Sequence, residues 1–476
     1  MSPRKVDFVI IGSGPAGQKA AVQAAKAGRS VLVVERGAAP GGECVHRGTI
    51  PSKTLRASAL NIAKLGQRTP GIAPREVGPG TKLSALMTRL DSVLELHEEV
   101  QRRQLTRNDI ELVQARARFV GPDELELVRP DGSLERVRAG NVDIAAGARP
   151  RAPEGMNVDH EHVLDSDSIL AIGWLPASLV VVGAGVIAAE FATIFQALGT
   201  NVTMIDRRAA PLGFLDAELV KRFVDRFEAA GGTFLGSVEP GRVEFDGGSG
   251  IVVELEGREP LRADKALVAL GRTASVRDLR LEAAGVEVSD RGFITVDENG
   301  CTSVPGIYAA GDVVGPPALA TSSMEQGRRA ALHALGRPAQ GSLEDVPVGI
   351  YTIPEMGMVG LTEEQARERC PDVIVGRSSY AEVARGLIDG EDSGMLKLLV
   401  DPATRRLLGA HAIGEGATEL IHLAQLARLG NLPIETFVEQ AFNFPTMAEN
   451  YRVAALDVLG REAALRRTRT SATASA

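Results

Sequence analysis

Cysteine is scarce in this chain, and the few cysteines lie far apart. The 476 residues include three of them, Cys44, Cys301 and Cys370. An odd number of widely separated cysteines argues against a framework of structural disulfides and favours a protein of the reducing cytoplasm. The sequence also has no cluster of His, Cys or carboxylate residues with the spacing of metal ligands, so no metal is expected.

Long runs of one charge are missing as well, and only one long apolar run is present. The formal charge is −8, from 53 basic and 61 acidic residues, without a long basic block. Nucleic acid and anionic membranes are therefore not expected as main partners.

Residues 179–199 are nearly all apolar and long enough to span a bilayer. Their glycines and Glu190 instead favour a buried strand, a turn and a helix. Asp7 and a glycine loop soon after the start argue against a signal peptide.

Length and composition are those of a globular protein with several domains. At roughly 150 residues per domain, the chain has room for about three. Its hydrophobic content of 44% and charged content of 24% are ordinary for soluble proteins and allow sizeable cores.

The chain begins with a pattern typical of a dinucleotide-binding unit. Residues 6–11 predict a buried parallel strand, 18–27 an Ala-rich helix, and 30–34 a second strand that ends at Glu35. Glycines in the intervening turn allow a tight bend, close approach of the backbone to a pyrophosphate, and close packing of helix on strand. The helix N-terminus attracts phosphate, and Glu35 is placed to bind a ribose diol. The turn residues expected to bind a cofactor are Gly12, Ser13, Gly14, Pro15, Ala16 and Gly17.

The same pattern returns in the middle of the chain. A strand over 178–182 leads into the turn Gly183-Ala184-Gly185-Val186-Ile187-Ala188, and a helix follows to about Leu198. A further strand over 201–205 ends at Asp206, which lies 21 residues after the second glycine, as Glu35 does in the first unit. One such fingerprint is weak evidence, because a glycine turn can exist without a ligand. Two copies with equal spacing predict an enzyme that binds two dinucleotides.

The segment after the first unit resembles a known family. Residues 41–53 are Gly-Gly-Glu-Cys-Val-His-Arg-Gly-Thr-Ile-Pro-Ser-Lys. They resemble the redox loop of the flavoprotein disulfide reductases, such as lipoamide dehydrogenase and glutathione reductase, which lies along FAD and holds two cysteines. Gly42 and Cys44 match that loop, but the place of the second, flavin-facing cysteine is taken by Thr49. Because threonine forms neither a disulfide nor a thiolate, electrons are not expected to leave the flavin through a cysteine pair.

Further motifs of the family follow in the expected order. Residues 307–312 resemble its second FAD motif, whose aspartate holds the ribityl chain of the flavin. Residues 142–147 and 267–272 resemble the strands where the chain leaves the FAD domain and the nicotinamide domain. The positions that this resemblance assigns to cofactor binding are Gly147, Gly271, Arg272, Gly311 and Asp312.

The resemblance implies an α/β fold with two Rossmann-like domains, one for FAD and one for NAD(P), and a C-terminal α+β dimerisation domain. Residues 84–104 favour a long amphipathic helix and 110–138 short strands, both within the FAD domain. The tail, basic and then rich in Ser, Thr and Ala, is predicted to be disordered. The predicted divisions are 1–152 and 276–345 for the two parts of the FAD domain, 153–275 for the nicotinamide domain, 346–460 for the dimerisation domain and 461–476 for the tail.

A second alteration lies near the C-terminus. The family's proton-shuttling histidine stands before a Pro-Thr-x-x-Glu stretch, but this chain has Phe444 there, and phenylalanine cannot carry a proton. Glu449, without that histidine, is expected to be structural. Thr49 and Phe444 together resemble the soluble (Si-specific) pyridine nucleotide transhydrogenases, a branch of the family. That branch implies FAD as cofactor, NAD and NADP(H) as substrates, and a homodimer or larger homo-oligomer.

The hydride-transfer residues of the family are retained. Lys53 resembles the lysine near the flavin N5, and Glu190 its ion-pair partner on the nicotinamide-domain helix. A cation near N5 favours acceptance of hydride. The helix that begins near Ala320 is expected to face the flavin pyrimidine with its N-terminus. Lys53, Glu190 and Thr49 form the predicted catalytic set, although two solvated charges are the alternative for the Lys53–Glu190 pair.

Cofactor preference stays open from the sequence. Asp206 lies where an acid binds the ribose diol of NAD and disfavours a 2′-phosphate. Arg207 and Arg208 follow at once and are able to bind that phosphate. The alternative is an NAD-only site with two solvated arginines. The roles of Cys44, which fits a small inert thiol, and of His46 in the same loop are also open.

These residues fit more than one function. The leading hypothesis is an FAD-dependent transhydrogenase that moves hydride between NADPH and NAD by a ping-pong route. The alternatives are a diaphorase or quinone reductase of the same fold, and an FAD-binding assembly subunit without activity. The direction of transfer and the size of the oligomer are not determined by the sequence.

Overall fold

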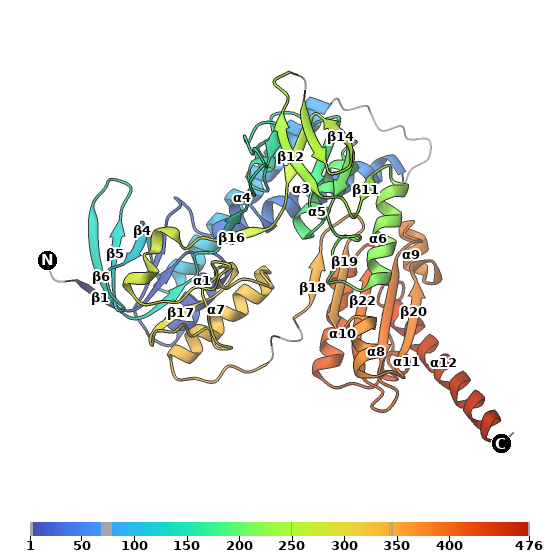
Figure 1. Cartoon of the computed structure of the whole chain (residues 1–476). Helices are drawn as coiled ribbons and strands as arrows, with labels where there is room; N and C mark the ends of the chain where they lie inside the picture. Colours follow the sequence, from blue (N-terminus) through green and yellow to red (C-terminus); the bar gives the residue numbers. More distant parts are fainter. Residues whose placement is uncertain (1–2, 68–78, 249, 342, 344–345, 475–476) are drawn as a thin grey trace.

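The described residues form three lobes, each built around one of the three largest sheets (Figure 1). The computed structural model describes residues 3–67, 79–248, 250–341, 343 and 346–474. The N-terminal and middle lobes are built on largely parallel sheets, whereas the C-terminal lobe is built on an antiparallel sheet. The predicted fold class, two Rossmann-like units followed by an α+β unit, is confirmed.

The N-terminal lobe forms around the first glycine turn. Its strand order is β3-β2-β1-β6-β5-β4, and β17 pairs with the end of β6 that β5 leaves free. Strand β2 is buried along its whole length, as expected for a central parallel strand covered on both faces. The strands are β1 (Arg4–Ile11), β2 (Val31–Glu35), β3 (Glu111–Gln114), β4 (Arg116–Phe119), β5 (Glu124–Val128), β6 (Leu134–Ile144) and β17 (Ile307–Ala309), and the helices that pack on them are α1 (Pro15–Lys26) and α7 (Ala320–Ala334).

The middle lobe repeats the design around the second glycine turn. Its five strands are all parallel, in the order β11-β10-β9-β15-β8, and a three-stranded antiparallel sheet joins them. Its elements are β8 (Val163–Leu164), β9 (Ser178–Val182), β10 (Asn201–Ile205), β11 (Thr233–Leu235), β15 (Lys265–Val268), α5 (Val186–Ala197) and α6 (Ala217–Ala229), with β12 (Pro240–Phe245), β13 (Ile251–Leu255) and β14 (Arg258–Ala263) in the small sheet.

The C-terminal lobe is an antiparallel sheet in the order β18-β19-β22-β21-β20. Its residues contribute to the same hydrophobic core as α10, α11 and α12. The elements are β18 (Val348–Ile350), β19 (Met356–Gly360), β20 (Ile374–Ser379), β21 (Met395–Val400), β22 (Leu407–Ile413), α8 (Glu363–Arg369), α9 (Ala384–Asp389), α10 (Ala417–Leu429), α11 (Thr436–Glu439) and α12 (Glu449–Ala474).

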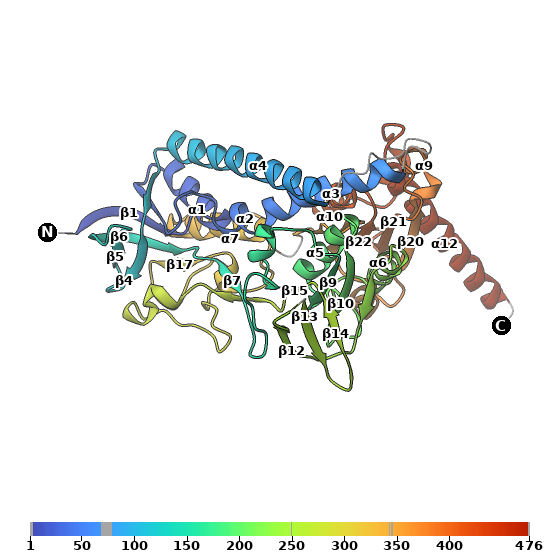
Figure 2. The same ribbon diagram turned by 90° about the horizontal axis from the view of Figure 1, so that it is seen from above.

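Three helices link the lobes. They are α2 (Gly42–His46), α3 (Thr49–Gln67) and α4 (Pro79–Arg107). In Figure 2 the long helix α4 runs from the N-terminal lobe toward the centre, and α3 continues toward the C-terminal lobe. Leu55 and Ala59 of α3 belong to one buried core with residues of α5 and with Ile350 and Met356 of the C-terminal lobe. The lobes therefore share apolar packing where they meet.

The apolar stretch 179–199 forms β9, a turn and α5, as its glycines predicted. Among the described residues, no helix is both long enough and apolar enough to cross a bilayer.

A two-stranded ribbon of β7 (Ala148–Pro150) and β16 (Arg272–Ala274) joins the N-terminal and middle lobes. The boundaries at 152, 275 and 345 stay predictions.

The prediction of a disordered tail over 461–476 is wrong for residues 461–474, because α12 continues to Ala474. Ala, Leu, Glu and Arg are good helix formers, and the segment has no proline to end the helix. Ion pairs one turn apart, Arg461–Asp457 at 2.9 Å and Arg466–Glu462 at 2.7 Å, add support. Helix α12 projects away from the lobe in both views (Figures 1 and 2). Residues 475–476 lie outside the described residues.

One carboxyl group stands in the N-terminal lobe without a partner. Asp143 lies on β6 between Ile10 of β1 and Tyr308 of β17, and it is buried. Neither of its side-chain oxygens has a hydrogen-bond partner among the described residues. Burial raises its pKa to about 7. Since the unfolded carboxyl ionises near pH 4, this group makes the protein lose stability as the pH rises from about 4 to about 7, and the loss stays constant above that range.

Replacing Asp143 with valine is expected to stabilise the protein, because a buried apolar β-former replaces an unpaired acid. The gain in free energy of unfolding should be larger at about pH 8 than at about pH 5.5, by about 2 kcal/mol, since the penalty grows over that range. Urea unfolding of both proteins at the two pH values measures it. Asp143→Asn should remove the same pH dependence with a smaller gain. An equal gain from valine at both pH values would contradict the argument.

Candidate functional site

The two glycine turns line a single cavity of about 1830 Å³. This volume exceeds the few hundred to about 1,000 Å³ of an ordinary ligand pocket, as a site for two dinucleotides requires. Nearly all of the residues predicted to bind cofactors or to act in catalysis lie on its wall. They are Gly12, Gly14, Pro15, Ala16, Glu35, Gly42, Cys44, Thr49, Lys53, Gly147, Gly183, Gly185, Glu190, Asp206, Arg207, Arg208, Gly271, Arg272, Gly311, Asp312 and Ala320.

The remaining two predicted residues, Ser13 and Gly17, support the first turn from behind. Gly17 has no room for a side chain, since a Cβ there would lie 2.0 Å from the Gly12 carbonyl oxygen. Gly12 has a φ of +104° and would place a Cβ 2.3 Å from the Ala145 oxygen at the end of β6. Gly14, in contrast, faces open space. The three glycines therefore have the separate roles expected of them: packing, turn, and clearance for a ligand.

Glu35 is fixed at the end of β2. One of its oxygens accepts hydrogen bonds from the Ser13 amide at 2.9 Å and the Ser13 hydroxyl at 2.6 Å. The other accepts from the Gly37 amide at 2.9 Å. The carboxylate is nearly buried and lines the cavity. It is thus held at the position from which a ribose diol could donate to it.

Asp206 occupies the matching position in the middle lobe, where it accepts from the Ala184 amide of the glycine turn at 2.8 Å. The Arg208 guanidinium also donates to it, through Nε at 3.1 Å and Nη2 at 3.2 Å. Although burial by itself raises the pKa of Asp206, these hydrogen bonds lower it below its ordinary value. Arg207 is exposed and lines the cavity beside them. The two arginines therefore differ, because Arg208 neutralises the acid, whereas among the described residues the Arg207 side chain forms no hydrogen bond or ion pair with it.

Lys53 and Glu190 form the ion pair that the sequence predicted. The ammonium of Lys53, on α3, lies 2.6 Å from Glu190 Oε2, on α5. Glu190 is only 4% exposed, so the alternative of two solvated charges does not hold. Its other oxygen accepts from the backbone amide of Tyr351 at 2.9 Å. The catalytic roles of the pair stay a prediction.

Tyr351 is a site residue that the sequence analysis missed. It follows β18 in the C-terminal lobe and lines the cavity, and the Lys53 ammonium lies 5.0 Å from the centre of its ring. A cation in this position is attracted to the ring face. Nearby, Ile353 donates from its backbone amide to Thr193 of α5 at 3.1 Å. No local motif marks Tyr351, since its importance arises from the way the C-terminal lobe docks on α5.

Thr49 is the first residue of α3, and Cys44 lies beside it on α2. Burial raises the pKa of the Cys44 thiol, and a hydrogen bond with Thr49 opposes this only in part. A thiol with a raised pKa stays protonated near neutral pH and is a poor nucleophile. Cys44 therefore fits the small inert thiol that the sequence suggested. His46 lies on the cavity wall too, with Nε2 3.1 Å from the Pro40 carbonyl oxygen.

Asp312 and Arg272 meet where the N-terminal and middle lobes join. Burial raises the pKa of Asp312, and the nearby guanidinium lowers it only in part. Arg272 Nε lies 3.7 Å from an Asp312 oxygen and, among the described residues, has no hydrogen-bond partner. A buried donor without a partner is costly unless a ligand satisfies it. Together with the open face of Gly14, this fits the binding of a polar cofactor such as FAD.

Phe444 and Glu449 do not line the cavity of their own chain. Phe444 is 68% exposed, on the loop before α12. Cys301 and Cys370 are also not among the described residues that line the cavity, and none of the three cysteines forms a disulfide. Among the described residues, no group of three or more His, Cys, Asp or Glu side chains is arranged to hold a metal ion.

Comparison with known proteins identifies the family. A family model described as pyridine nucleotide-disulphide oxidoreductase matches residues 6–327, and the model of its dimerisation domain matches residues 346–455. The chain belongs to the pyridine nucleotide-disulphide oxidoreductases. The family resemblance drawn from the redox-loop segment is thus confirmed.

Within this oxidoreductase family, the chain is similar to soluble transhydrogenases. It is 43% identical to the soluble pyridine nucleotide transhydrogenase of Mycobacterium tuberculosis over 468 residues, which cover 98% of this chain and all of that protein. It is 38% identical over 459 residues to the protein of the same name from Colwellia psychrerythraea, covering 96% of this chain and 98% of that one. The branch that Thr49 and Phe444 indicated is therefore also confirmed.

Two solved structures share the fold. LpdA from Mycobacterium tuberculosis superposes with a TM-score of 0.88 at 26% identity, over 94% of this chain and 99% of that one. The HOCl-induced flavoprotein disulfide reductase RclA from Escherichia coli gives a TM-score of 0.84 at 27% identity, over 94% and 99% of the two chains.

The Tyr351 ring is expected to hold Lys53 in place. Tyr351→Leu removes the ring but keeps the backbone amide that bonds Glu190. It should slow the oxidation of NADPH by about threefold to tenfold, the range expected for a partly buried cation–π contact. Tyr351→Phe is the control and should stay close to the unaltered protein in a steady-state assay. Equal rates for the leucine and phenylalanine variants would show that the ring does not act on Lys53.

Proposed function

We propose that this protein is an FAD-dependent transhydrogenase that moves hydride between NADPH and NAD by a ping-pong route, without a redox disulfide. The observation that carries the proposal is one cavity lined by both glycine turns, with Thr49 where the family has its flavin-facing cysteine. The names of the relatives agree with this assignment.

The N-terminal lobe supplies the residues that would hold FAD. The α1 N-terminus with Gly14 would receive the pyrophosphate, and Glu35 the adenosine ribose. Asp312 would bind the ribityl chain, and the α7 N-terminus at Ala320 would face the pyrimidine. When bound, FAD supplies a group that accepts hydride from one nicotinamide and returns it to another.

The chain's own residues supply orientation and charge. Lys53 is held on the cavity wall by Glu190 and Tyr351, so its ammonium is fixed before any substrate arrives. A fixed cation stabilises the negative charge that develops during hydride transfer without reorganising at that moment. Because Glu190 accepts from both α3 and the C-terminal lobe, it connects the nicotinamide unit to each of them.

A ping-pong order follows from the number of sites. If the first turn binds FAD, the second turn with Asp206 is the one remaining dinucleotide site on the cavity wall of the described residues. NADPH and NAD would then bind there in succession, and the first product must leave before the second substrate enters. Cys44, whose thiol stays protonated, and Thr49 give no disulfide to which the electrons could be diverted.

Use of both nucleotides is supported by the Asp206–Arg208 pair. An acid at this position repels the 2′-phosphate of NADP, but Arg208 neutralises Asp206 through two hydrogen bonds from its side chain. The remaining donors of Arg208, with the nearby Arg207, are available to a phosphate. Asp206 can still accept from the ribose diol of NAD.

A homodimer is part of the proposal. The C-terminal lobe matches the family's dimerisation domain. The large apolar side chains exposed on it would be covered by a second copy. They include Leu387, Ile388, Leu426, Leu429 and Phe444. A cytoplasmic location, inferred from the sparse cysteines, also stays a prediction.

Stopped-flow spectroscopy under anaerobic conditions tests the function. NADPH should bleach the flavin band of the purified protein, and mixing with NAD should restore it rapidly, with one NADH formed per flavin. Bleaching without recovery by NAD, but with rapid recovery by a quinone, would reject transhydrogenation in favour of a quinone reductase. The absence of bleaching by NADPH or NADH would indicate a silent FAD-binding subunit.

Arg208→Ala tests the basis of dual specificity. The substitution uncovers the charge of Asp206 and removes a phosphate donor, so it should raise the KM for NADPH about tenfold relative to the KM for NADH. Arg207→Ala is the matched control, and a smaller change in the ratio is expected because Arg207 does not neutralise Asp206. Equal changes in the KM for both nucleotides after Arg208→Ala would contradict this explanation.

A further inference from the structure

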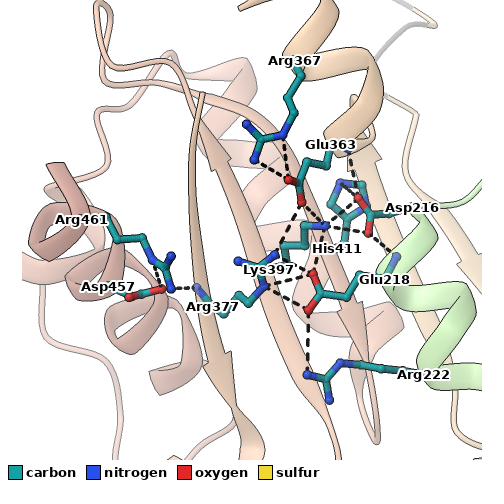
Figure 3. A network of polar contacts seen from close by, with 10 residues as sticks. All are labelled: Asp216, Glu218, Arg222, Glu363, Arg367, Arg377, Lys397, His411, Asp457 and Arg461. Carbon is teal, nitrogen blue, oxygen red and sulfur yellow. Dashed lines mark hydrogen bonds and ion pairs between the residues drawn. The ribbon is translucent and has the colours of Figure 1, made fainter. Parts of the chain in front are cut away.

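A buried lysine in the C-terminal lobe contacts the middle lobe. In the sequence, this lysine is far from both glycine turns. Lys397, on β21, is 1% exposed, and its ammonium lies 2.8 and 3.0 Å from the two oxygens of Asp216. It also lies 3.2 Å from Glu218 and 2.7 Å from Glu363. Figure 3 shows these carboxylates gathered around the one ammonium. We call Lys397, Asp216, Glu218 and Glu363 the lysine clasp.

The clasp joins two lobes. Asp216 and Glu218 come from the start of α6 in the middle lobe, whereas Lys397 and Glu363 come from β21 and α8 of the C-terminal lobe. Arg377, on β20, reinforces it by donating to Glu218 at 2.8 Å. Burial of this much charge is costly unless every group is paired, so the geometry of the cluster is strongly constrained.

Lys397 is the cation that Asp216 depends on. The neighbouring imidazole of His411, opposite Lys397 on β22, has a pKa lowered to about 4, mainly by burial, so it is neutral near pH 7. Burial raises the pKa of Asp216, yet the imidazole of His411 at 4.0 Å, the ammonium of Lys397 and the Glu363 amide together lower it below the ordinary value. Asp216 is therefore a carboxylate, and its side chain also caps α6 by accepting from the Glu218 amide at 3.0 Å.

The clasp lies at the end of the loop that carries the nucleotide-recognition residues. Residues 206–216 run from Asp206, through Arg207 and Arg208, to Asp216, without a regular helix or strand. Midway, the Leu212 amide donates to the Ala184 carbonyl of the glycine turn at 2.9 Å. Leu212 is buried in a core that also contains Ala184. The loop is thus fixed at its start by β10, in its middle by the glycine turn, and at its end by Lys397.

We propose that Lys397 is a positioning residue for the adenosine-ribose end of the nicotinamide nucleotide. By fixing Asp216, it holds the loop 206–216 and with it the Asp206–Arg208 pair on the cavity wall. The contacts between the C-terminal lobe and the middle lobe then include one at Glu190, the partner of Lys53, and one at Asp216, where the loop that begins with Asp206 ends. This inference rests on the proposed function only in taking the second turn as the nicotinamide nucleotide site.

The test measures binding, which needs no turnover. Lys397→Met keeps the length of the side chain and removes the charge, leaving three carboxylates without their shared cation. Calorimetric titration of the oxidised holoprotein should show NAD and NADP binding weakened about tenfold. ADP-ribose, which has the adenosine half but no nicotinamide, should lose affinity by the same factor. In steady state the KM for the nucleotides should rise, with kcat at saturation within about twofold.

Two further variants keep the test decisive. Lys397→Met combined with Asp216→Asn removes both charges but keeps an N-cap for α6, and it replaces the single variant if that one does not fold. Arg405→Met is the matched control, because it takes a cation from Glu435 and Glu462 entirely within the C-terminal lobe. The control should leave nucleotide binding unchanged.

The proposal is overturned if Lys397→Met, or the double variant where Lys397→Met does not fold, binds ADP-ribose as tightly as the unaltered protein, or if kcat falls while KM stays constant. It is also overturned if Arg405→Met weakens binding as much as Lys397→Met, since the effect would then be general destabilisation. If the unaltered protein binds NAD and NADP but transfers no hydride between them, the proposed function fails, while the binding comparison still decides the role of Lys397.

Discussion

The buried carboxylate of Glu190 is the point on which the arrangement of the lobes depends. It lies on α5 of the middle lobe, accepts from Lys53 of α3, and accepts from the Tyr351 amide of the C-terminal lobe. A buried charge that loses either donor pays a desolvation penalty of several kcal/mol, by order of magnitude. The three parts of the chain are therefore held together at the place where the two halves of the cavity meet.

Apolar packing and small residues support the same arrangement. A single core joins α3, α5 and strands of the C-terminal lobe. In the N-terminal lobe, α1 and α7 approach so closely that a Cβ on Gly327 would lie 2.1 Å from the Ala16 carbonyl oxygen. Such contacts bring the α7 N-terminus to the cavity wall beside the first glycine turn. The lysine clasp adds an electrostatic contact at the far end of the middle lobe.

The altered redox loop is consistent with this architecture. Thr49 is the first residue of α3, and α3 carries Lys53 one turn later, so the helix is needed whether or not a disulfide precedes it. The reactive thiol chemistry can be lost while the scaffold and its cation are retained. Replacement of the shuttle histidine by Phe444 fits the same pattern, because a transfer between two nicotinamides does not require protons to be delivered to thiols.

The sequence by itself determined the two nucleotide-binding units, the order of the lobes, and the residues Glu35, Lys53, Glu190 and Asp206. Glu35 and Asp206 follow from local rules, since a glycine turn between a strand and a helix and an acid at a fixed distance are set by neighbouring backbone. Lys53 and Glu190 were assigned by the resemblance to the family. The helix at 461–474 was missed because the prediction of disorder was based on the composition of the tail alone. Only the tertiary structure decided that Tyr351 lies on Lys53, that Arg208 neutralises Asp206, and that Lys397 binds Asp216. Tyr351 and Lys397 contact residues more than 150 positions away in the sequence. Arg208 is close to Asp206 in the sequence, but the direction of its side chain depends on packing. Sequence spacing alone therefore does not specify these contacts.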